Sequence, residues 1–300
     1  MTERPISWDE IFEKLTEKQN LSDLQINWAM SQILDGLANN DQIKNFLLLL
    51  KAKGEKPSEV RALVDVMYQR GIAINIAERA VDIVGTGGDG ASTINISTTA
   101  AIITTAAGAR TIKHGNRAAS SKSGAADLLE ALGIDISLGA EQIQECVRRI
   151  GIGFAFAPVF HPAMKNAASA RRELATPTVF NILGPLANPA KPKAVAIGVA
   201  RAELLELVAT VLAERGCEGF IFRGDDGLDE ISLSTTSTIY QINKGEITRH
   251  IFDPSEIGLE RVGIEELRGG TPSENADITR AIFAGRGGAY RQAVLLNAAA

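Results

Sequence analysis

The feature that most constrains the fold of this chain is a change of sequence pattern near residue 80. Within residues 7–71, apolar residues recur at helical spacing in four successive segments. After this point, the short apolar run at 81–84 is followed by a glycine-rich loop and then by a helical stretch over 97–107. The order strand, loop, helix is typical of an α/β sheet domain. The chain is therefore predicted to contain two parts of different structural class.

Residues 1–75 are expected to form a small all-helical domain, which a further helical segment near 165–188 rejoins. Residues 76–300 are expected to form a large α/β domain with a mostly parallel central sheet, because strands alternate with helices. Its strands are predicted at 81–84, 110–113, 194–199, 219–222 and 238–242. An apolar helix that starts at Ala293 has no polar end, which suggests a chain truncated at its C-terminus.

The run Phe46 to Leu50 is apolar all round a helix, unlike a surface helix. This helix is expected either at the centre of a bundle or under another subunit.

Charge and cysteine content exclude several classes of protein. The net charge of -5 predicts no general attraction to nucleic acid or to an anionic membrane. The 2 cysteines lack zinc-site spacing and are expected to be reduced thiols of a cytoplasmic protein. No apolar run approaches the roughly eighteen residues of a membrane span, and no signal peptide is predicted.

The glycine loop, residues 85–90, matches the dinucleotide-binding pattern GxGxxG. That pattern needs an acidic residue about twenty positions later to hold a ribose hydroxyl. No Asp or Glu lies between Asp89 and Asp127, and no Gly-Lys-Ser/Thr follows the loop. A nicotinamide cofactor and a nucleotide-binding P-loop are therefore both disfavoured.

The same acid-free stretch contains basic and hydroxyl side chains around a predicted helix start near Ser97. Glycine backbone amides and a helix N-terminus can converge on an anion, and lysines add positive charge. The stretch therefore favours a phosphate or pyrophosphate site. The alternative is a tight turn with exposed basic side chains.

The acidic run at 225–230 follows a predicted strand, where ligands bind in open α/β sheets. Magnesium commonly accompanies phosphate chemistry and takes one or two carboxylates. A solvated acidic loop is equally compatible with this run.

Two histidines and a pair of arginines are the other candidates. His114 is expected in a loop beside the phosphate site, and His161 in a turn before Pro162; single histidines are more often structural. Arg171 and Arg172 point about 100° apart on a predicted helix, so at most one should face the site. A guanidinium suits a carboxylate ligand.

Several motifs together resemble those of the anthranilate phosphoribosyltransferase family. They are GTGGDG at 85–90, NIST at 95–98, KHGNRAASSKSGAADLLEALG at 113–133, FAPVFHPAMK at 156–165, RREL at 171–174, TVFNILGPLANP at 178–189 and GLDEIS at 227–232.

The resemblance implies a class II nucleoside phosphorylase-like fold and a homodimer formed through the helical domain. It implies transfer of a phosphoribosyl group from 5-phosphoribosyl 1-diphosphate to anthranilate, in tryptophan biosynthesis, with two Mg²⁺ ions. Neither nucleic acid nor membrane is an expected partner.

The resemblance also implies roles for residues at matching positions. The sugar diphosphate would be bound by Gly85, Gly88, Asp89, Asn95, Ser97, Thr98, Lys113, Asn116, Arg117, Ala118, Ala119, Ser120 and Ser121. Anthranilate would be bound by Gly85, His114, Asn116, Pro158, His161 and Arg171. Magnesium would be held by Ser97, Asp229 and Glu230. No catalytic acid or base is assigned.

One position departs from the family: Ala175 stands where the family usually has glycine. Two other functions stay open from the sequence. One is a pyrimidine nucleoside phosphorylase, which has a related fold, and the other is a non-catalytic relative that binds nucleic acid.

Overall fold

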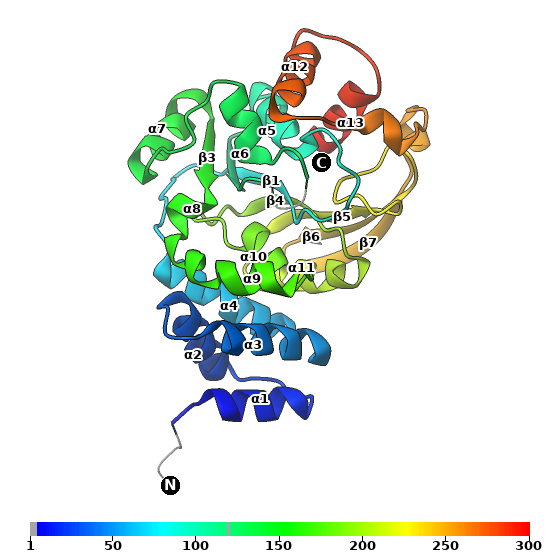
Figure 1. Ribbon diagram of the computed structural model, residues 1–300. Helices are drawn as coiled ribbons and strands as arrows, with labels where there is room; N and C mark the ends of the chain where they lie inside the picture. Colours follow the sequence, from blue (N-terminus) through cyan, green and yellow to red (C-terminus); the bar gives the residue numbers. More distant parts are fainter. Residues whose placement is uncertain (1–4, 119–120) are drawn as a thin grey trace.

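The structure is a computed structural model that describes residues 5–118 and 121–300. A helical domain forms the base of the molecule in Figure 1, and a larger α/β domain stands above it. This arrangement confirms the predicted fold class.

The helical domain consists of α1 (Trp8–Thr16), α2 (Asp23–Leu34), α3 (Asn40–Lys53) and α4 (Pro57–Arg70). The first three helices begin at side-chain caps, because Ser7, Ser22 and Asn39 each accept a hydrogen bond from the amide three residues later. Within the run 46–50, Phe46, Leu47 and Leu50 are buried. The inward faces of the four helices therefore form one apolar core.

A later segment of the chain packs on this domain. It comprises a 3₁₀ turn at Pro162–Ala167, then α9 (Ala168–Leu174) and α10 (Phe180–Leu186). Glu173 accepts hydrogen bonds from Asn40 Nδ2 at 2.8 Å and from Lys44 Nζ at 2.9 Å. These contacts tie α9 to α3.

The α/β domain is built on a seven-stranded sheet of order β3-β2-β1-β4-β5-β6-β7. The first five strands in this order are parallel, and β6 and β7 pair in the antiparallel direction. The strands are β1 (Val81–Gly85), β2 (Thr111–Gly115), β3 (Ile152–Phe156), β4 (Ala194–Gly198), β5 (Glu218–Gly224), β6 (Ser237–Asn243) and β7 (Glu246–Phe252).

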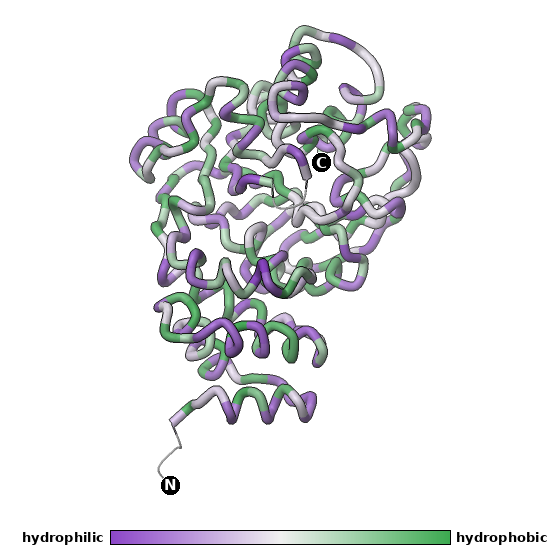
Figure 2. The backbone as a smooth tube through the Cα atoms, viewed as in Figure 1, coloured by the Kyte–Doolittle hydropathy of each residue, from purple (hydrophilic) through white to green (hydrophobic). Residues whose placement is uncertain are grey.

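Helices cover this sheet, and the tube in Figure 2 shows apolar segments concentrated along the central strands and the inner sides of the helices. The remaining helices are α5 (Ile96–Ala106), α6 (Ala125–Ala131), α7 (Ala140–Ile150), α8 (Ala157–Phe160), α11 (Leu205–Glu214), α12 (Pro272–Phe283) and α13 (Ala289–Ala298). In the described part of the chain, no helix is both long enough and apolar enough to cross a membrane.

Three local predictions differ from the structure. Strands β3 and β7 were not predicted, because β3 contains Gly153 and β7 is an edge strand with mostly exposed residues. Helix α13 begins at Ala289, four positions before the predicted start. His114 lies within β2 and not in a loop, since the strand continues to Gly115.

Candidate active site

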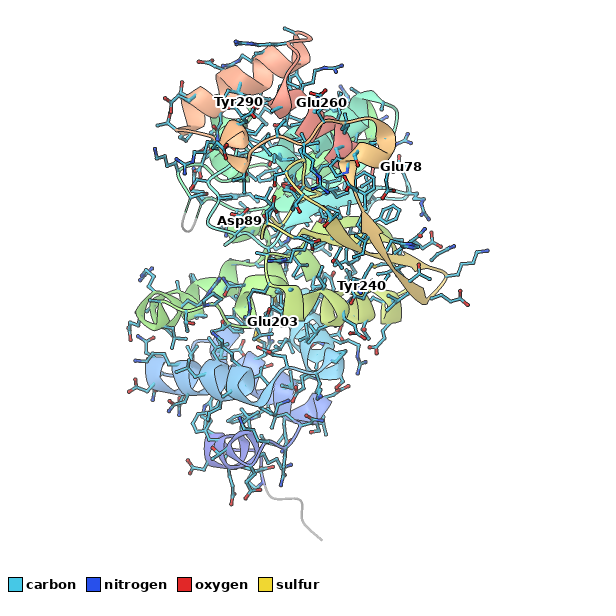
Figure 3. The ribbon with its side chains drawn as sticks, turned by 90° about the vertical axis from the view of Figure 1, so that its right-hand side faces the viewer. Glu78, Asp89, Glu203, Tyr240, Glu260 and Tyr290 are labelled. Atoms are coloured by element: carbon cyan, nitrogen blue, oxygen red, sulfur yellow. The ribbon has the colours of Figure 1, made fainter. Side chains whose placement is uncertain are left out.

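The glycine loop leaves the carboxyl end of β1 and is shaped by glycine backbone angles. Gly87, Gly88 and Gly90 have φ values of 69°, 80° and 75°, in the left-handed region that favours glycine. Asp89, between them, accepts a hydrogen bond from the amide of Ala91 at 3.1 Å. In Figure 3 this residue lies between Tyr290 near the top of the α/β domain and Glu203 near its base.

The acidic turn after β5 lies against this loop. Asp229 Oδ2 accepts a hydrogen bond from Gly87 N–H at 2.6 Å, and Glu230 Oε1 accepts one from Ser97 N–H at 3.1 Å. Ser97 is in the first turn of α5, where backbone amides have no partner within the helix. The turn and the loop therefore meet through two carboxylates and two backbone amides.

Lys113, on β2, supplies a buried positive charge beside this contact. Its Nζ atom donates to the carbonyl oxygen of Ile83 and, at 3.3 Å, to Ser97 Oγ. Burial lowers the pKa of Lys113, whereas the nearby carboxylates of Asp82, Glu230 and Asp229 oppose that change. The ammonium group is thus held among acceptors at the carboxyl ends of the central strands.

The two carboxylates are destabilised in their charged forms. Burial, followed by repulsion from Asp89, raises the pKa of Asp229 to about 7. Burial and repulsion from Asp229 raise the pKa of Glu230 well above its ordinary value. A bound cation would offset the repulsion between these two buried negative charges.

These residues fit a magnesium ion that also binds a phosphate. No group of three or more His, Cys, Asp or Glu side chains within 5–118 and 121–300 is arranged as a ready-made metal site. Mg²⁺ usually takes one or two protein carboxylates and completes its shell with water and substrate phosphates. Asp229 and Glu230 meet that requirement.

The two predicted anthranilate histidines lie together, with ring centroids 5.3 Å apart. His114 Nδ1 is 2.8 Å from the carbonyl oxygen of Gly184, and His161 Nε2 is 2.8 Å from that of Ala187. His114 Nε2 is buried and has no hydrogen-bond partner in the described residues. Burial and repulsion from His161 lower the pKa of His114 to about 3, so the ring is neutral.

Arg171 lies in the last turn of α9, with its guanidinium carbon 6.0 Å from the ring centroid of Phe180. The side chain is exposed and has no carboxylate within 4 Å in the described part of the chain. The helix ends at Ala175, which has φ 47° and ψ 22°. This is the left-handed conformation in which a glycine would be unstrained.

Asn95 and Arg117 have partners that sequence motifs do not indicate. Asn95 Oδ1 accepts hydrogen bonds from Ser123 Oγ at 3.0 Å and Asn275 Nδ2 at 2.9 Å. The guanidinium of Arg117 pairs with Asp127 at 3.0 Å and Glu130 Oε1 at 2.9 Å. Asn95 therefore links the loop before α6 to α12, and Arg117 is directed to α6.

The structure brings Gly85, Asp89, Ser97, Lys113, Asp229 and Glu230 into one site at the carboxyl ends of β1, β2 and β5. Thr98 is buried in α5, whereas Gly88, Asn116, Pro158 and Ser121 are exposed and Ala118 is half-buried. Ala119 and Ser120 lie outside the described residues. All these ligand assignments remain predictions.

Two residues that the motifs did not identify shape the site. Asp82 is buried in β1, where it accepts hydrogen bonds from Asn188 Nδ2 at 2.8 Å and His114 N–H at 3.3 Å. An acidic residue in an otherwise apolar strand is the signal that could have identified it. Gly198 ends β4, and its Cα lies against the backbone of Asp229.

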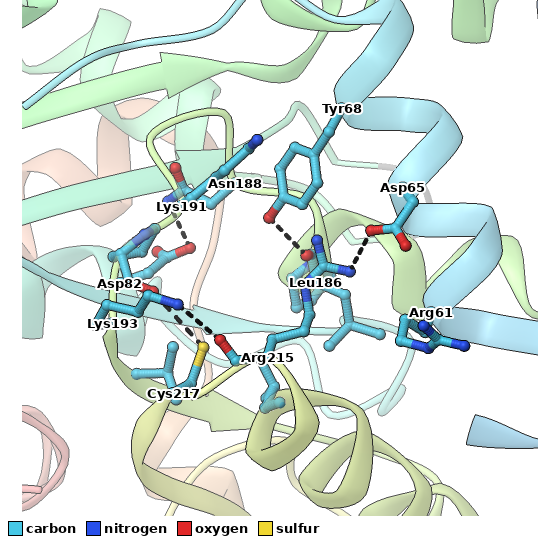
Figure 4. Close-up of a pocket in the computed structure, with 14 residues that line it drawn as sticks. Arg61, Asp65, Tyr68, Asp82, Leu186, Asn188, Lys191, Lys193, Arg215 and Cys217 are labelled. Carbon is cyan, nitrogen blue, oxygen red and sulfur yellow. Dashed lines mark hydrogen bonds and ion pairs between the residues drawn. The ribbon is translucent and has the colours of Figure 1, made fainter. Parts of the chain in front are cut away.

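A separate cleft of about 250 Å³ lies where α4 meets the α/β domain (Figure 4). It is lined by Tyr68 of α4, by Lys191 and Lys193 before β4, and by Arg215 and Cys217 before β5. These positions are at the amino ends of the strands, whereas ligands in open α/β sheets bind at the carboxyl ends. None of the predicted binding residues lines this cleft.

Comparison with known families and proteins follows the same division into two domains. Residues 9–71 match a glycosyl transferase family, helical bundle domain, and residues 77–300 match a glycosyl transferase family, a/b domain. The anthranilate phosphoribosyltransferase of Rhodococcus jostii is 51% identical over 294 residues, which is 98% of this chain and 81% of the relative. That of Mycolicibacterium smegmatis is 51% identical over 296 residues, with the same coverage.

Solved structures agree with these relatives. Anthranilate phosphoribosyltransferase from Thermus thermophilus has a TM-score of 0.90 and 39% identity, over 96% of this chain and 87% of that one. The Saccharomyces cerevisiae enzyme in complex with PRPP and Mg has a TM-score of 0.87 and 29% identity, over 97% and 85%. These similarities favour neither the nucleoside phosphorylase nor the nucleic-acid-binding alternative.

Proposed function

The chain belongs to the anthranilate phosphoribosyltransferase family, and we propose that its loop at 85–90, Lys113 and the Asp229–Glu230 pair perform that family's reaction. The reaction transfers the phosphoribosyl group of 5-phosphoribosyl 1-diphosphate to anthranilate and releases pyrophosphate. The observation that carries this assignment is the meeting of the glycine loop and the acidic turn. Gly87 N–H donates to Asp229 at 2.6 Å, and Ser97 N–H donates to Glu230 at 3.1 Å.

The diphosphate would lie against the glycine loop and the first turn of α5, where amides and the helix dipole favour negative charge. Lys113 would add a fixed positive charge as the bond between the ribose carbon and the pyrophosphate oxygen breaks. Asp229 and Glu230 would hold Mg²⁺, which when bound supplies charge neutralisation to the departing pyrophosphate. We propose two Mg²⁺ ions, because the motifs resemble those of the family, which implies two.

The acceptor amine would attack the ribose carbon while that carbon has oxocarbenium-like character, as in other glycosyl transfers. An aniline nitrogen is unprotonated near neutral pH, so it needs orientation more than a strong base. His114 Nε2, a buried acceptor without a partner in the described residues, is suited to receive an amine N–H. Arg171 would pair with the carboxylate of anthranilate.

Direct assay tests the activity. Purified protein is mixed with Mg²⁺, 5-phosphoribosyl 1-diphosphate and anthranilate, and the fluorescence of anthranilate is followed. We expect its loss only when all components are present, with one pyrophosphate released per anthranilate consumed. Unchanged fluorescence together with phosphorolysis of thymidine or uridine would instead support the nucleoside phosphorylase function.

A homodimer formed through the helical domain is a further part of the proposal. Leu24, Leu37 and Leu48 of this domain are 70%, 67% and 41% exposed, and burial of such side chains in an interface is favourable. Sedimentation equilibrium should give twice the chain mass of 31.9 kDa. A single-chain mass at micromolar concentration would contradict the dimer.

A role in tryptophan biosynthesis, in the cytoplasm, is proposed from the reaction itself. Expression in a bacterial strain that lacks anthranilate phosphoribosyltransferase should restore growth without tryptophan. The Asp229→Asn variant should not restore it.

A further inference from the structure

One amide side chain of α13 forms hydrogen bonds with the backbone of the turn that carries Asp229 and Glu230. Asn297 is 1% exposed, and its Oδ1 atom accepts a hydrogen bond from Ile231 N–H at 2.8 Å. Its Nδ2 atom donates to the carbonyl oxygen of Ile231 at 3.0 Å and to that of Ala293 at 3.0 Å. Ile231 directly follows Glu230 in the sequence. One side chain therefore satisfies both backbone polar groups next to the acidic pair.

This pairing requires a primary amide, because only an amide offers a donor and an acceptor side by side. An aspartate at position 297 would place a second acceptor against two carbonyl oxygens. An alanine would leave the buried amide and carbonyl of Ile231 without that partner, and an unsatisfied buried polar group costs about 1–3 kcal/mol. The backbone next to Glu230 would then be free to adopt other positions.

The acidic turn has a reason to move when this restraint is absent. Asp229 and Glu230 are neighbouring carboxylate side chains that are both buried, and like charges held close together away from water repel each other. Their bonds to Gly87 and Ser97 reach only the glycine loop and the start of α5. Asn297 acts on the opposite side of the turn, through the backbone and not through the carboxylates.

We propose that Asn297 is a positioning residue that keeps the two carboxylates together for a divalent cation. Restraints of this kind change metal affinity, typically by 10–100-fold when they are removed. This inference rests on the proposed metal role of Asp229 and Glu230, and it extends that role to α13.

The test measures Mn²⁺ binding by electron paramagnetic resonance, in protein saturated with 5-phosphoribosyl 1-diphosphate and without anthranilate. We expect Asn297→Ala to raise the Kd for Mn²⁺ at least tenfold and to speed hydrogen exchange of the Ile231 amide at least tenfold. Tyr290→Phe is the matched control, because it removes the hydrogen bond of α13 to the carbonyl oxygen of Arg268 at 2.7 Å and leaves the turn intact. Its Kd should stay within twofold of wild type.

A Kd within twofold of wild type in Asn297→Ala, despite faster exchange at Ile231, would overturn the inference. If the alanine variant does not fold, Asn297→Ser is measured in the same way and judged by the same limits. Asp229→Asn distinguishes a failure of the positioning role of Asn297 from a failure of the metal role of the acidic pair. Unchanged Mn²⁺ binding in that variant would contradict the proposed metal role itself, whereas weakened binding there with normal binding in Asn297→Ala would contradict only the positioning role.

Discussion

Gly198 lies directly against the carbonyl oxygen of Asp229, so that a Cβ atom at position 198 would be only 1.7 Å from it. The close contact with the end of β4 thereby sets the distance between the acidic turn and the sheet. Gly85 does the same from β1, since a Cβ there would be 2.2 Å from Asp229 Oδ2. Two adjacent strand ends without side chains therefore make room for the acidic turn.

The Gly198→Ala variant should displace the acidic turn, because the clash is with backbone atoms that cannot rotate away. We expect turnover to fall more than about a hundredfold, equivalent to about 2.7 kcal/mol of transition-state stabilisation. Steady-state assay at saturating substrates and magnesium measures this. Gly287→Ala is the control, since no atom lies within 4 Å of a Cβ there. Equal turnover of the two variants would contradict the close packing of turn and strand.

The Asp229→Asn and Glu230→Gln variants should each lower turnover by more than about a hundredfold, because each removes a carboxylate proposed to hold magnesium. Asp225→Asn changes an exposed carboxylate of the same acidic run and should stay within about threefold of wild type. The rates are compared at saturating Mg²⁺. Near-normal turnover of both site variants would remove these residues from the metal site.

The Arg171→Ala variant should raise the KM for anthranilate about tenfold or more, because a charge-assisted hydrogen bond contributes about 1.5–3 kcal/mol. The KM for 5-phosphoribosyl 1-diphosphate should change less than about twofold, since Arg171 is assigned to the acceptor only. Arg172→Ala, on the neighbouring face of α9, is the control. An unchanged KM for anthranilate in Arg171→Ala would exclude this residue from the acceptor pocket.

The Ala175→Gly variant should stabilise the protein by about 0.5–1 kcal/mol. Glycine relieves the left-handed strain at φ 47°, and its greater freedom in the unfolded chain offsets part of the gain. Urea unfolding measures the difference. Ala168→Gly, at the start of the same helix, should instead destabilise, because its backbone is helical. A loss of stability in Ala175→Gly would show that the strain is absent in solution.

The contribution of His114 to the free energy of unfolding should fall as the pH is lowered from 7.5 to 5.5, whereas the raised pKa values of Asp82, Asp229 and Glu230 act in the opposite direction. Burial holds the pKa of His114 at about 3, below its ordinary 6.5, so protons bind the unfolded chain more readily below pH 6.5. The stabilisation is complete above pH 6.5 and is lost through the window down to about 3, by about 1.4 kcal/mol per unit. Burial lowers the pKa of His161 in the same direction.

His114→Asn isolates this contribution, because its amide nitrogen can still donate to Gly184 while no group titrates there. Lowering the pH from 7.5 to 5.5 should change the unfolding free energy of this variant by about 1 kcal/mol more in favour of the folded state than it changes that of wild type. Equal pH dependence in wild type and variant would contradict a neutral, buried His114.

The sequence predicted the parts of the molecule that have strong local signals. Ser7 and Ser22, each followed three positions later by Glu or Gln, indicate helix starts, and the glycine loop with its acid-free stretch indicates an anion site beside β1. The glycines of that loop have the positive φ angles that motivate such a prediction. These signals are local because caps and glycine turns act over a few residues.

Other features depend on contacts between distant residues. Strand β7 lies at the sheet edge and carries polar residues such as Thr248 and Arg249, so it lacks an apolar alternation. Asn297 and Ile231 are 66 positions apart, and no spacing rule connects them. The partners of Asn95 likewise come from α12 and from the loop before α6. Such pairs are visible only after the fold is known.

The most direct test is a crystal structure of the protein soaked with 5-phosphoribosyl 1-diphosphate and Mg²⁺. Density for the diphosphate should appear between residues 85–98 and the Asp229–Glu230 turn, with a metal ion between the phosphate oxygens and at least one of the two carboxylates. A fully occupied ligand bound elsewhere, with this space left to water, would contradict the proposal that the glycine loop and the acidic turn together hold the leaving group.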